Sequence, residues 1–262
     1  MTNNQIRFDD GAAYERYMGK WSQLAGEMFL DWLAPKSGLR WLDVGCGNGA
    51  FTELLVARCA PVTVDGVDPA EGQLAYARTR PVSRLAQFHQ GDAMALPFSD
   101  GSFDVAVMPL VIFFVPEPAK GVAEMARVVS SGGSVAAYGW DMLGGGFPYE
   151  ALLSEMRGLD LVVPEPPNPG AASINTLRDL WADAGLEAIE TREIIVQRTF
   201  ADFDDYWTTV IGAPSVGATL RSMAAAEQTH LKEALRRRLP ADAAGSITYS
   251  ARANAVKGRV PD

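Results

Sequence analysis

The sequence is poor in the residues that most often bind metals or cross-link a chain. Its 262 residues include two cysteines, Cys46 and Cys59, and two histidines, His89 and His230. Two cysteines cannot form a disulfide framework, and no Cys/His group has the spacing of zinc ligands, so no metal is expected. No uncharged apolar run reaches the roughly 18 residues of a transmembrane helix. The first ten residues also lack the apolar segment of a secretory leader, so we expect a soluble cytoplasmic protein.

Positive charge is scarce as well. The chain has 23 Lys and Arg against 32 Asp and Glu, a net charge of −9. Such a field repels polyanions, whereas binding to nucleic acid in general needs a basic stripe. The densest basic run, Arg236–Arg238, lies near the end of a predicted helix, where it can complement the helix dipole. We therefore expect neither a nucleic-acid partner nor a membrane partner.

What is present is a repeated alternation of strand and helix patterns. Hydrophobic residues make up 48 % of the chain, enough for a sizeable core. Short apolar segments alternate with segments of helical period, which predicts right-handed crossovers and a parallel sheet covered on both faces. Strands are expected at 40–45, 62–68, 86–92, 104–108, 134–140, 187–200 and 247–256. Helices are expected at 51–59, 72–78, 119–129 and 175–184, and one helix or a helix pair at 14–33.

Residues 201–246 interrupt this alternation with a long stretch of helical period. The strands on either side are expected to pair antiparallel, and such a connection needs only a few residues. The insertion therefore predicts a helical lid that closes over a substrate, and the alternative is a homodimer interface. The expected parts are an N-terminal helical cap at 1–37, the core at 38–200, the lid at 201–246, and a final antiparallel strand with the C-terminal tail at 247–262.

The strongest motif is the glycine-rich turn in WLDVGCGNGAF at 41–51, where an apolar strand runs into a helix. Glycines permit a tight turn and let a ligand lie against the backbone, and the helix N-terminus offers free N–H groups. The spacing of Gly45, Gly47 and Ala50 also satisfies the dinucleotide fingerprint, so a nicotinamide-dependent oxidoreductase stays an alternative.

Three carboxylates follow the first three predicted strands. Asp43 stands where a dinucleotide site usually has an apolar residue, and it can accept from the loop amides or attract a cationic ligand. Asp68 ends the second strand and can accept both hydroxyls of a ribose. Asp92 follows the third strand and can accept from an adenine amino group. The structural alternative for each is a turn or cap residue.

Four segments, WLDVGCGNG, VDGVDPAEGQLAYAR, QGDAMALPFSDGSFDV and EMARVVSSGGSV, occur in the order seen in class I S-adenosylmethionine-dependent methyltransferases. Over roughly residues 38–138 the chain resembles their ubiquinone and menaquinone biosynthesis type. The resemblance implies a Rossmann-like α/β fold with a seven-stranded, mostly parallel sheet, its last strand antiparallel, and helices on both faces. It implies methyl transfer from S-adenosylmethionine to a small-molecule acceptor, with the O, N or C atom left open. A non-catalytic binder of the same cofactor is a further alternative.

The resemblance also implies which residues contact the cofactor. The glycine turn would surround the methionine part and the ribose edge, Asp68 would hold the ribose hydroxyls, and Asp92 with Ala93 would contact the adenine edge. Gln73 stands where many relatives have a methionine packed on the adenine, and Cys46 is interpreted as a small filler of the turn. The full set is Asp43, Gly45, Cys46, Gly47, Gly49, Asp68, Pro69, Gln73, Asp92, Ala93, Met108, Pro109 and Leu110.

A catalytic base is hard to identify. His89 lies in the third predicted strand and is interpreted as structural, whereas His230 in the insertion is either a lid histidine or part of a solvated helix face. A sulfonium is already an activated donor, so alignment and desolvation can supply much of the rate. The catalytic residue therefore stays unassigned, with His230 as a candidate. The aromatic-rich segments predict an acceptor site formed by Tyr14, Tyr17, Met18, Trp21, Tyr206 and Trp207.

Overall fold

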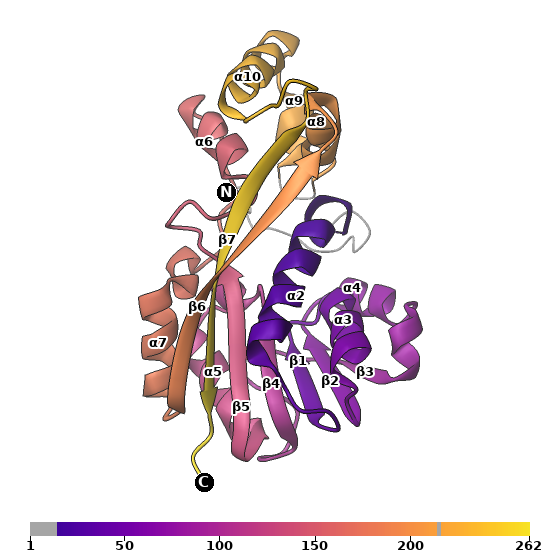
Figure 1. Cartoon of the computed structure of the whole chain (residues 1–262), viewed down its shortest axis with the longest axis vertical. Coiled ribbons are helices and arrows are strands. Elements are labelled where there is room, and N and C mark those ends of the chain that lie inside the picture. Colours follow the sequence, from indigo (N-terminus) through magenta and orange to yellow (C-terminus); the bar gives the residue numbers. More distant parts are fainter. Residues whose placement is uncertain (1–14, 214–215) are drawn as a thin grey trace.

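The computed structural model describes residues 15–213 and 216–262. Its centre is a seven-stranded sheet with the strand order β3-β2-β1-β4-β5-β7-β6 (Figure 1). Strands β1 to β5 run parallel, and β7 is antiparallel to both of its neighbours. This topology confirms the predicted Rossmann-like fold. The strands are β1 (Arg40–Val44), β2 (Thr63–Asp68), β3 (Ala86–Gln90), β4 (Phe103–Pro109), β5 (Val129–Trp140), β6 (Glu187–Phe200) and β7 (Ile247–Arg259).

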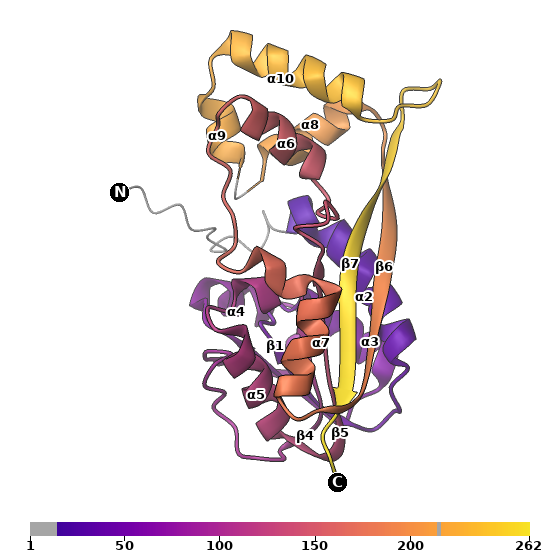
Figure 2. The same ribbon diagram turned by 90° about the vertical axis from the view of Figure 1, so that its left-hand side faces the viewer.

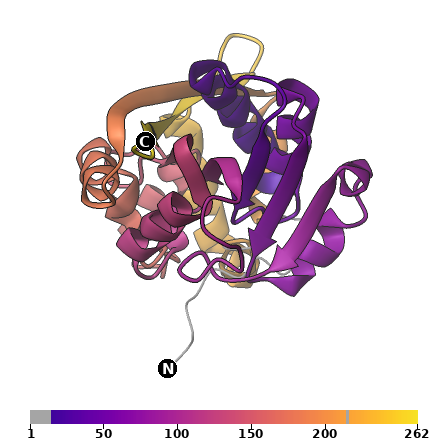
Figure 3. The ribbon, with the colours of Figure 1, turned by 90° about the horizontal axis from the view of Figure 1, so that it is seen from below.

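Helices cover both faces of the sheet, as a parallel sheet requires. On one face α2 (Lys20–Leu33) packs with α3 (Ala50–Cys59), and on the other α5 (Pro118–Val128) packs with α7 (Ile174–Asp183) (Figures 2 and 3). The central strands are accordingly buried: four of the five residues of β1 are inaccessible. The remaining helical segments of the core are α4 (Glu71–Ala77), η2 (Pro81–Arg84), η3 (Ile112–Phe114) and η4 (Pro169–Ala172).

The described part of the N-terminal segment is mostly helical. It begins with a π-helical turn, η1 (Glu15–Gly19), and α2 then packs along β6 and against α3. Helix α2 is therefore part of the helical layer on the sheet, and η1 is the part that reaches helix α8 (Phe203–Ile211). The sequence analysis also missed α6 (Glu150–Gly158), because the flanking loops rich in Gly and Pro obscured its short apolar pattern.

Strands β6 and β7 extend beyond the rest of the sheet. They pair as far as Phe200 opposite Ile247, whereas the last residue of β5, Trp140, pairs with Ala253. The two strands therefore continue as a two-stranded ribbon that leads into the helical insertion, residues 201–246 (Figure 1). The described residues of the insertion form α8, α9 (Gly217–Ser222) and α10 (Ala225–Arg238), and α10 packs against α6 (Figure 2).

Candidate functional site

The glycine-rich turn after β1 is fixed to the end of β2 by backbone hydrogen bonds. The N–H groups of Gly45 and Cys46 both donate to the carbonyl oxygen of Val67, at 2.7 and 3.1 Å. The turn thus lies beside Asp68, the last residue of β2. The structure therefore brings the first two predicted cofactor elements together at the carboxyl ends of adjacent parallel strands, where open α/β sheets bind their ligands.

The three glycines of this turn are needed for different physical reasons. A Cβ on Gly45 would lie 2.4 Å from Cγ2 of Val111, and one on Gly49 would crowd α4 and β3 at 3.2 Å. At Gly47, which has φ +51°, the nearest atom to a Cβ would be Oε1 of Gln73, at 3.8 Å. Gly45 and Gly49 therefore permit close packing within the protein, while the backbone of Gly47 is open on the side where a Cβ would lie.

Asp68 is buried and already organises the turn. Its Oδ2 accepts from the N–H of Gly47 at 2.9 Å, and its Oδ1 accepts from the N–H of Ala70 at 2.8 Å. Burial raises the pKa of this carboxyl, and the two backbone hydrogen bonds oppose that shift. Each carboxylate oxygen has further acceptor capacity, so the same group can also accept hydroxyls.

Asp43 is fully buried and only partly satisfied. Its Oδ2 accepts from the hydroxyl of Thr52 at 2.7 Å, while its Oδ1 has no hydrogen-bond partner. Burial raises the pKa of Asp43 to about 7; the Thr52 hydrogen bond lowers it, and the charge of Asp68 raises it further. An orphaned carboxylate oxygen next to a glycine turn suits a cationic ligand, because a buried charge is stable only when it is paired. The residues present therefore fit S-adenosylmethionine, which carries a sulfonium and an ammonium group.

Further predicted cofactor residues follow the ends of β1, β2 and β3. The Cys46 side chain packs on Gly66, and burial raises the pKa of its thiol well above the ordinary value, in agreement with its interpretation as a filler. Asp92 is exposed, and its Oδ1 accepts from the N–H of Met94 at 2.8 Å, which makes it a turn residue in this structure. Exposed Pro69 directly follows Asp68, and Ala93 directly follows Asp92.

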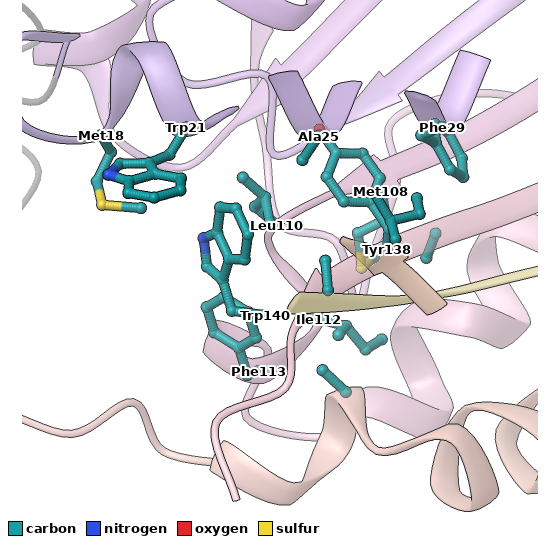
Figure 4. Packing of buried hydrophobic residues seen from close by; sticks show 14 of the residues in the cluster. Met18, Trp21, Ala25, Phe29, Met108, Leu110, Ile112, Phe113, Tyr138 and Trp140 are labelled. Atoms are coloured by element: carbon teal, nitrogen blue, oxygen red, sulfur yellow. The ribbon is translucent and has the colours of Figure 1, made fainter. Parts of the chain in front are cut away.

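Beyond β4 the chain forms an apolar wall. Leu110 has φ +60°, an uncommon conformation for a non-glycine residue, and its N–H donates to the carbonyl oxygen of Tyr138 at 2.7 Å. Figure 4 shows Leu110 and Trp140 opposite Met18 and Trp21 of the N-terminal segment. Of the other predicted residues here, Pro109 is buried, and Met108 is fully buried with its side chain against α5.

A buried aromatic cluster adjoins this wall and gathers several predicted acceptor residues. Tyr149, which the sequence analysis did not single out, is its centre. Its ring stacks on Tyr17 at 4.3 Å between centroids and lies 6.4 Å from Trp21 and 6.2 Å from Tyr206. The Tyr149 hydroxyl donates to the carbonyl oxygen of Tyr17 at 2.7 Å. Tyr14, the remaining aromatic residue predicted in the N-terminal segment, lies outside the described residues.

Two predicted residues lie elsewhere. Trp207 packs within the insertion, stacked on Phe203 with the ammonium group of Lys232 4.8 Å from its ring centroid. His230 is exposed on α10 and borders a cavity of about 290 Å³. None of the predicted cofactor residues lines that cavity, so the structure does not join His230 to the cofactor site. Its lining residues are Leu159, Leu161, Met223, Ala226, Glu227 and His230.

One residue of the site carried no signal in the sequence. The Arg80 guanidinium donates to the carbonyl oxygen of Asn48 at 2.7 Å and to Glu53 at 2.8 Å, and it also bonds Glu15. It therefore links the glycine turn, α3 and the N-terminal segment. Nothing in the surrounding sequence predicts these partners, because they lie 27 to 65 residues away.

Comparisons with known proteins agree with this geometry. Residues 42–137 match the family model described as a methyltransferase domain. The chain is 34 % identical over 111 residues to the ubiquinone/menaquinone biosynthesis C-methyltransferase UbiE of Roseobacter denitrificans, covering 41 % of this chain and 44 % of that protein. It is 33 % identical over 153 residues to the malonyl-[acyl-carrier protein] O-methyltransferase of Methylococcus capsulatus, covering 58 % of this chain and 51 % of that protein. The chain thus spans about half the length of these curated relatives.

A solved structure extends the agreement to the fold. Phosphoethanolamine N-methyltransferase 2 of Haemonchus contortus, in complex with S-adenosyl-L-methionine, matches 99 % of this chain and 59 % of its own with a TM-score of 0.62 and 18 % identity. Residues 42–137 are therefore a methyltransferase domain. This domain is similar to those of the ubiquinone and menaquinone methyltransferases, in agreement with the enzyme class predicted from the motifs, and the solved structure shares the fold.

Within residues 15–213 and 216–262, no helix combines the length and apolarity needed to cross a membrane. The same residues contain no group of three or more His, Cys, Asp or Glu side chains placed to hold a metal ion.

Proposed function

We propose that this protein transfers a methyl group from S-adenosylmethionine to a small-molecule acceptor. The observation that carries the proposal is the arrangement of Asp43, Gly47 and Asp68: a buried carboxylate with an orphaned oxygen, an open backbone and a second carboxylate at a strand end. When bound, the cofactor supplies a methyl group already activated by its sulfonium. Asp68 accepts the ribose hydroxyls, Gly47 admits the ligand to the backbone, and Asp43 complements its positive charge.

The acceptor is mostly apolar and either uncharged or weakly acidic. Support comes from the wall formed by Met18, Trp21, Leu110 and Trp140, all of which are buried hydrophobic residues. Such a wall excludes water and aligns the acceptor, which lets displacement proceed without a strong base. We assign no catalytic base. The relatives are named for C-, O- and N-methylation, so the acceptor atom has to come from experiment.

The helical insertion, together with α6, closes the acceptor site as a lid. Support comes from the aromatic cluster. The ring of Tyr206 on α8 packs against that of Tyr149, which in turn stacks on Tyr17 of the N-terminal segment. A homodimer interface is the second candidate role of this surface. The charge of −9 supports a protein without a nucleic-acid partner, and we place it in the cytoplasm.

Calorimetry with S-adenosylmethionine, S-adenosylhomocysteine and NAD tests the proposal. Binding of S-adenosylmethionine and S-adenosylhomocysteine, with no binding of NAD, supports the proposal. Binding of NAD with no binding of S-adenosylhomocysteine overturns it. A second measurement follows S-adenosylhomocysteine production with panels of phenolic, amine and activated-carbon acceptors. Binding without turnover on every panel would favour a non-catalytic cofactor binder.

A further inference from the structure

The core-facing row of β6 contains an arginine. Ile194, Val196 and Phe200 of this row are buried, and Arg198 stands between them. In the register of β6 and β7, Arg198 lies directly opposite Tyr249. Positive charge on such a row is costly unless it has a partner, because the same strand face is otherwise apolar.

No carboxylate of the described residues forms an ion pair with Arg198. Its guanidinium lies 4.3 Å from the centroid of the Phe200 ring and makes two long contacts through Nη1. These contacts are to the hydroxyl of Tyr149 at 3.3 Å and to the carbonyl oxygen of Tyr17 at 3.4 Å. A guanidinium has five N–H donors, so most of its hydrogen-bonding capacity is unused.

Two neighbouring hydroxyls are also unsatisfied. The hydroxyl oxygens of Tyr206 and Tyr249 are buried and have no hydrogen-bond partner. Their rings lie 6.3 Å apart, and both pack against Phe200, at 5.3 and 5.9 Å. Burial raises the pKa of both phenols, so they remain protonated donors near neutral pH. Buried hydroxyls without partners are rare in native proteins and often mark the place of a missing ligand or water.

We propose that Arg198, Tyr206 and Tyr249 form a subsite for an oxyanion carried by the methyl acceptor. The acceptor class is an aromatic or apolar molecule that ends in a carboxylate or another singly charged oxyanion. The guanidinium and the phenol of Tyr249, which lies opposite it in the register, would donate to that group, and Tyr206 adds a second phenol whose ring lies 6.3 Å from that of Tyr249. Hydrogen bonds between such donors and an ionised acceptor are strong because they are charge-assisted. The aromatic rings around these donors match the apolar remainder of the molecule.

The position of this subsite relative to the methyl donor rests on the proposed function. Trp21 connects the two regions: its ring lies 5.2 Å from that of Tyr249, and it stands opposite Leu110 in the apolar wall (Figure 4). The subsite therefore lies behind one aromatic side chain of the wall. Tyr206 comes from the helical insertion, whereas Arg198 and Tyr249 come from the ribbon, so a bound oxyanion would join the two.

A pair of probes of equal shape tests the charge requirement. Benzoate and benzamide are titrated separately into protein saturated with S-adenosylhomocysteine, with binding followed by ligand-observed NMR. Benzoate is expected to bind about tenfold more tightly than benzamide, as for a hydrogen-bonded group that carries a charge. Equal affinities for benzoate and benzamide overturn the proposal. So does the absence of benzoate binding to the wild type up to about 10 mM, which is roughly the range in which weak fragments bind.

Variants separate a binding role from a packing role. Arg198→Gln is expected to weaken benzoate about tenfold and Arg198→Lys by less, because lysine keeps the charge. Tyr206→Phe is expected to weaken benzoate about threefold while raising the melting temperature, because it removes an unsatisfied buried hydroxyl. A purely structural cluster gives the rise in melting temperature without the loss of affinity, which also overturns the proposal.

Two controls complete the design. Arg192→Gln removes an exposed arginine of the same strand and should leave benzoate binding unchanged. Titration of every variant with S-adenosylhomocysteine alone reports on the cofactor site independently. If the wild type does not bind S-adenosylhomocysteine, the proposed function is contradicted. If it binds S-adenosylhomocysteine but binds benzoate and benzamide equally, only the oxyanion subsite is contradicted.

Discussion

Asp68 holds the backbone N–H of Gly47 through Oδ2 at 2.9 Å, and so joins the end of β2 to the turn that follows β1. The same carboxylate binds the N–H of Ala70 through Oδ1. The carboxylate that we propose as the ribose acceptor is therefore already oriented by the protein before a ligand binds. Preorganisation of this kind reduces the entropy lost on binding.

Asp68→Ala is expected to raise the dissociation constant of S-adenosylhomocysteine about tenfold or more. It removes an ionised acceptor whose hydrogen bonds contribute roughly 1.5–3 kcal/mol, and it releases Gly47. Calorimetry provides the measurement. Asp65→Ala is the matched control, because Asp65 lies on the same strand but bonds His89 at 2.7 Å. Equal affinity of the Asp68 variant and the wild type would contradict the assignment.

Gly47→Ala tests whether the open side of the turn is the ligand's place. In the free protein the new Cβ would make only ordinary van der Waals contacts, with Oε1 of Gln73 at 3.8 Å and the carbonyl oxygen of Gly45 at 4.0 Å, so the strain comes from φ +51° alone. Gly38→Ala is the control, with φ +75° and no atom within 4 Å. Both variants should lose about 1 kcal/mol of stability. Only the Gly47→Ala variant should bind S-adenosylhomocysteine more weakly, and Gly47→Val should abolish binding. An equal loss of affinity in the Gly38→Ala variant would refute this.

Asp43→Asn is expected to change the pH dependence of stability. Burial raises the native pKa of Asp43 to about 7 from 3.8, so the native state binds an extra proton between these values. Stability therefore falls as pH rises from about 4 to about 7, by up to about 4 kcal/mol at 1.36 kcal/mol per pKa unit. The variant should fall less steeply over that window.

Urea unfolding from pH 4 to pH 8 measures this difference. Asp68, whose pKa is also raised by burial, leaves a residual slope of the same sign in the variant. Parallel profiles for the wild type and Asp43→Asn would show that Asp43 keeps an ordinary pKa in the folded protein.

Arg80→Met is expected to loosen the glycine turn. The Arg80 side chain is only 12 % exposed, and it connects the Asn48 carbonyl with Glu53 and Glu15. Its loss should weaken S-adenosylhomocysteine about fivefold, since hydrogen bonds to a charged group contribute roughly 1.5–3 kcal/mol and only part acts on the turn. Faster amide exchange at 45–50 should accompany this. Arg58→Met, which removes the exposed pair with Asp31, should change neither quantity.

Hydrogen exchange distinguishes a lid from a dimer interface. Slower exchange in residues 15–33 and 201–245 on addition of S-adenosylhomocysteine, at a constant oligomeric state, is expected for a lid. These segments meet in the aromatic cluster around Tyr149, so closure should protect both together. Exchange that depends on protein concentration and not on ligand would identify an interface between two copies.

The sequence predicted the sheet, because buried parallel strands depend on local pattern, and it singled out the residues proposed for the donor side for the same reason. Buried parallel strands are short apolar runs, and Asp43, Gly47 and Asp68 lie within or beside them at fixed spacing. The different structural roles of Gly45 and Gly47 could not be predicted. A Cβ on Gly45 would collide with Val111, and no local signal in the sequence places Val111 beside the turn.

The proposed acceptor side was less predictable because its contacts join distant segments. Tyr149 precedes a helix that the flanking glycines and prolines concealed, and its partners come from η1 and α8. Trp207 is on the same helix as Tyr206, but it lies against Lys232 within the insertion, whereas Tyr206 joins the cluster around Tyr149. Only tertiary packing distinguishes these two positions. Arg198 can be recognised in the sequence, because it is a cation at a position where the alternating pattern of the strand places the residues two before and two after it in the core.

The ribbon has a consequence for how such enzymes diversify. The chain leaves the ribbon at Phe200 and returns at Ile247, which is hydrogen-bonded beside it. An insertion between two such neighbours can be lengthened, shortened or exchanged during evolution without shifting the register of any strand. Selection can therefore remodel this one segment while the sheet and the glycine-rich turn remain under their own separate constraint.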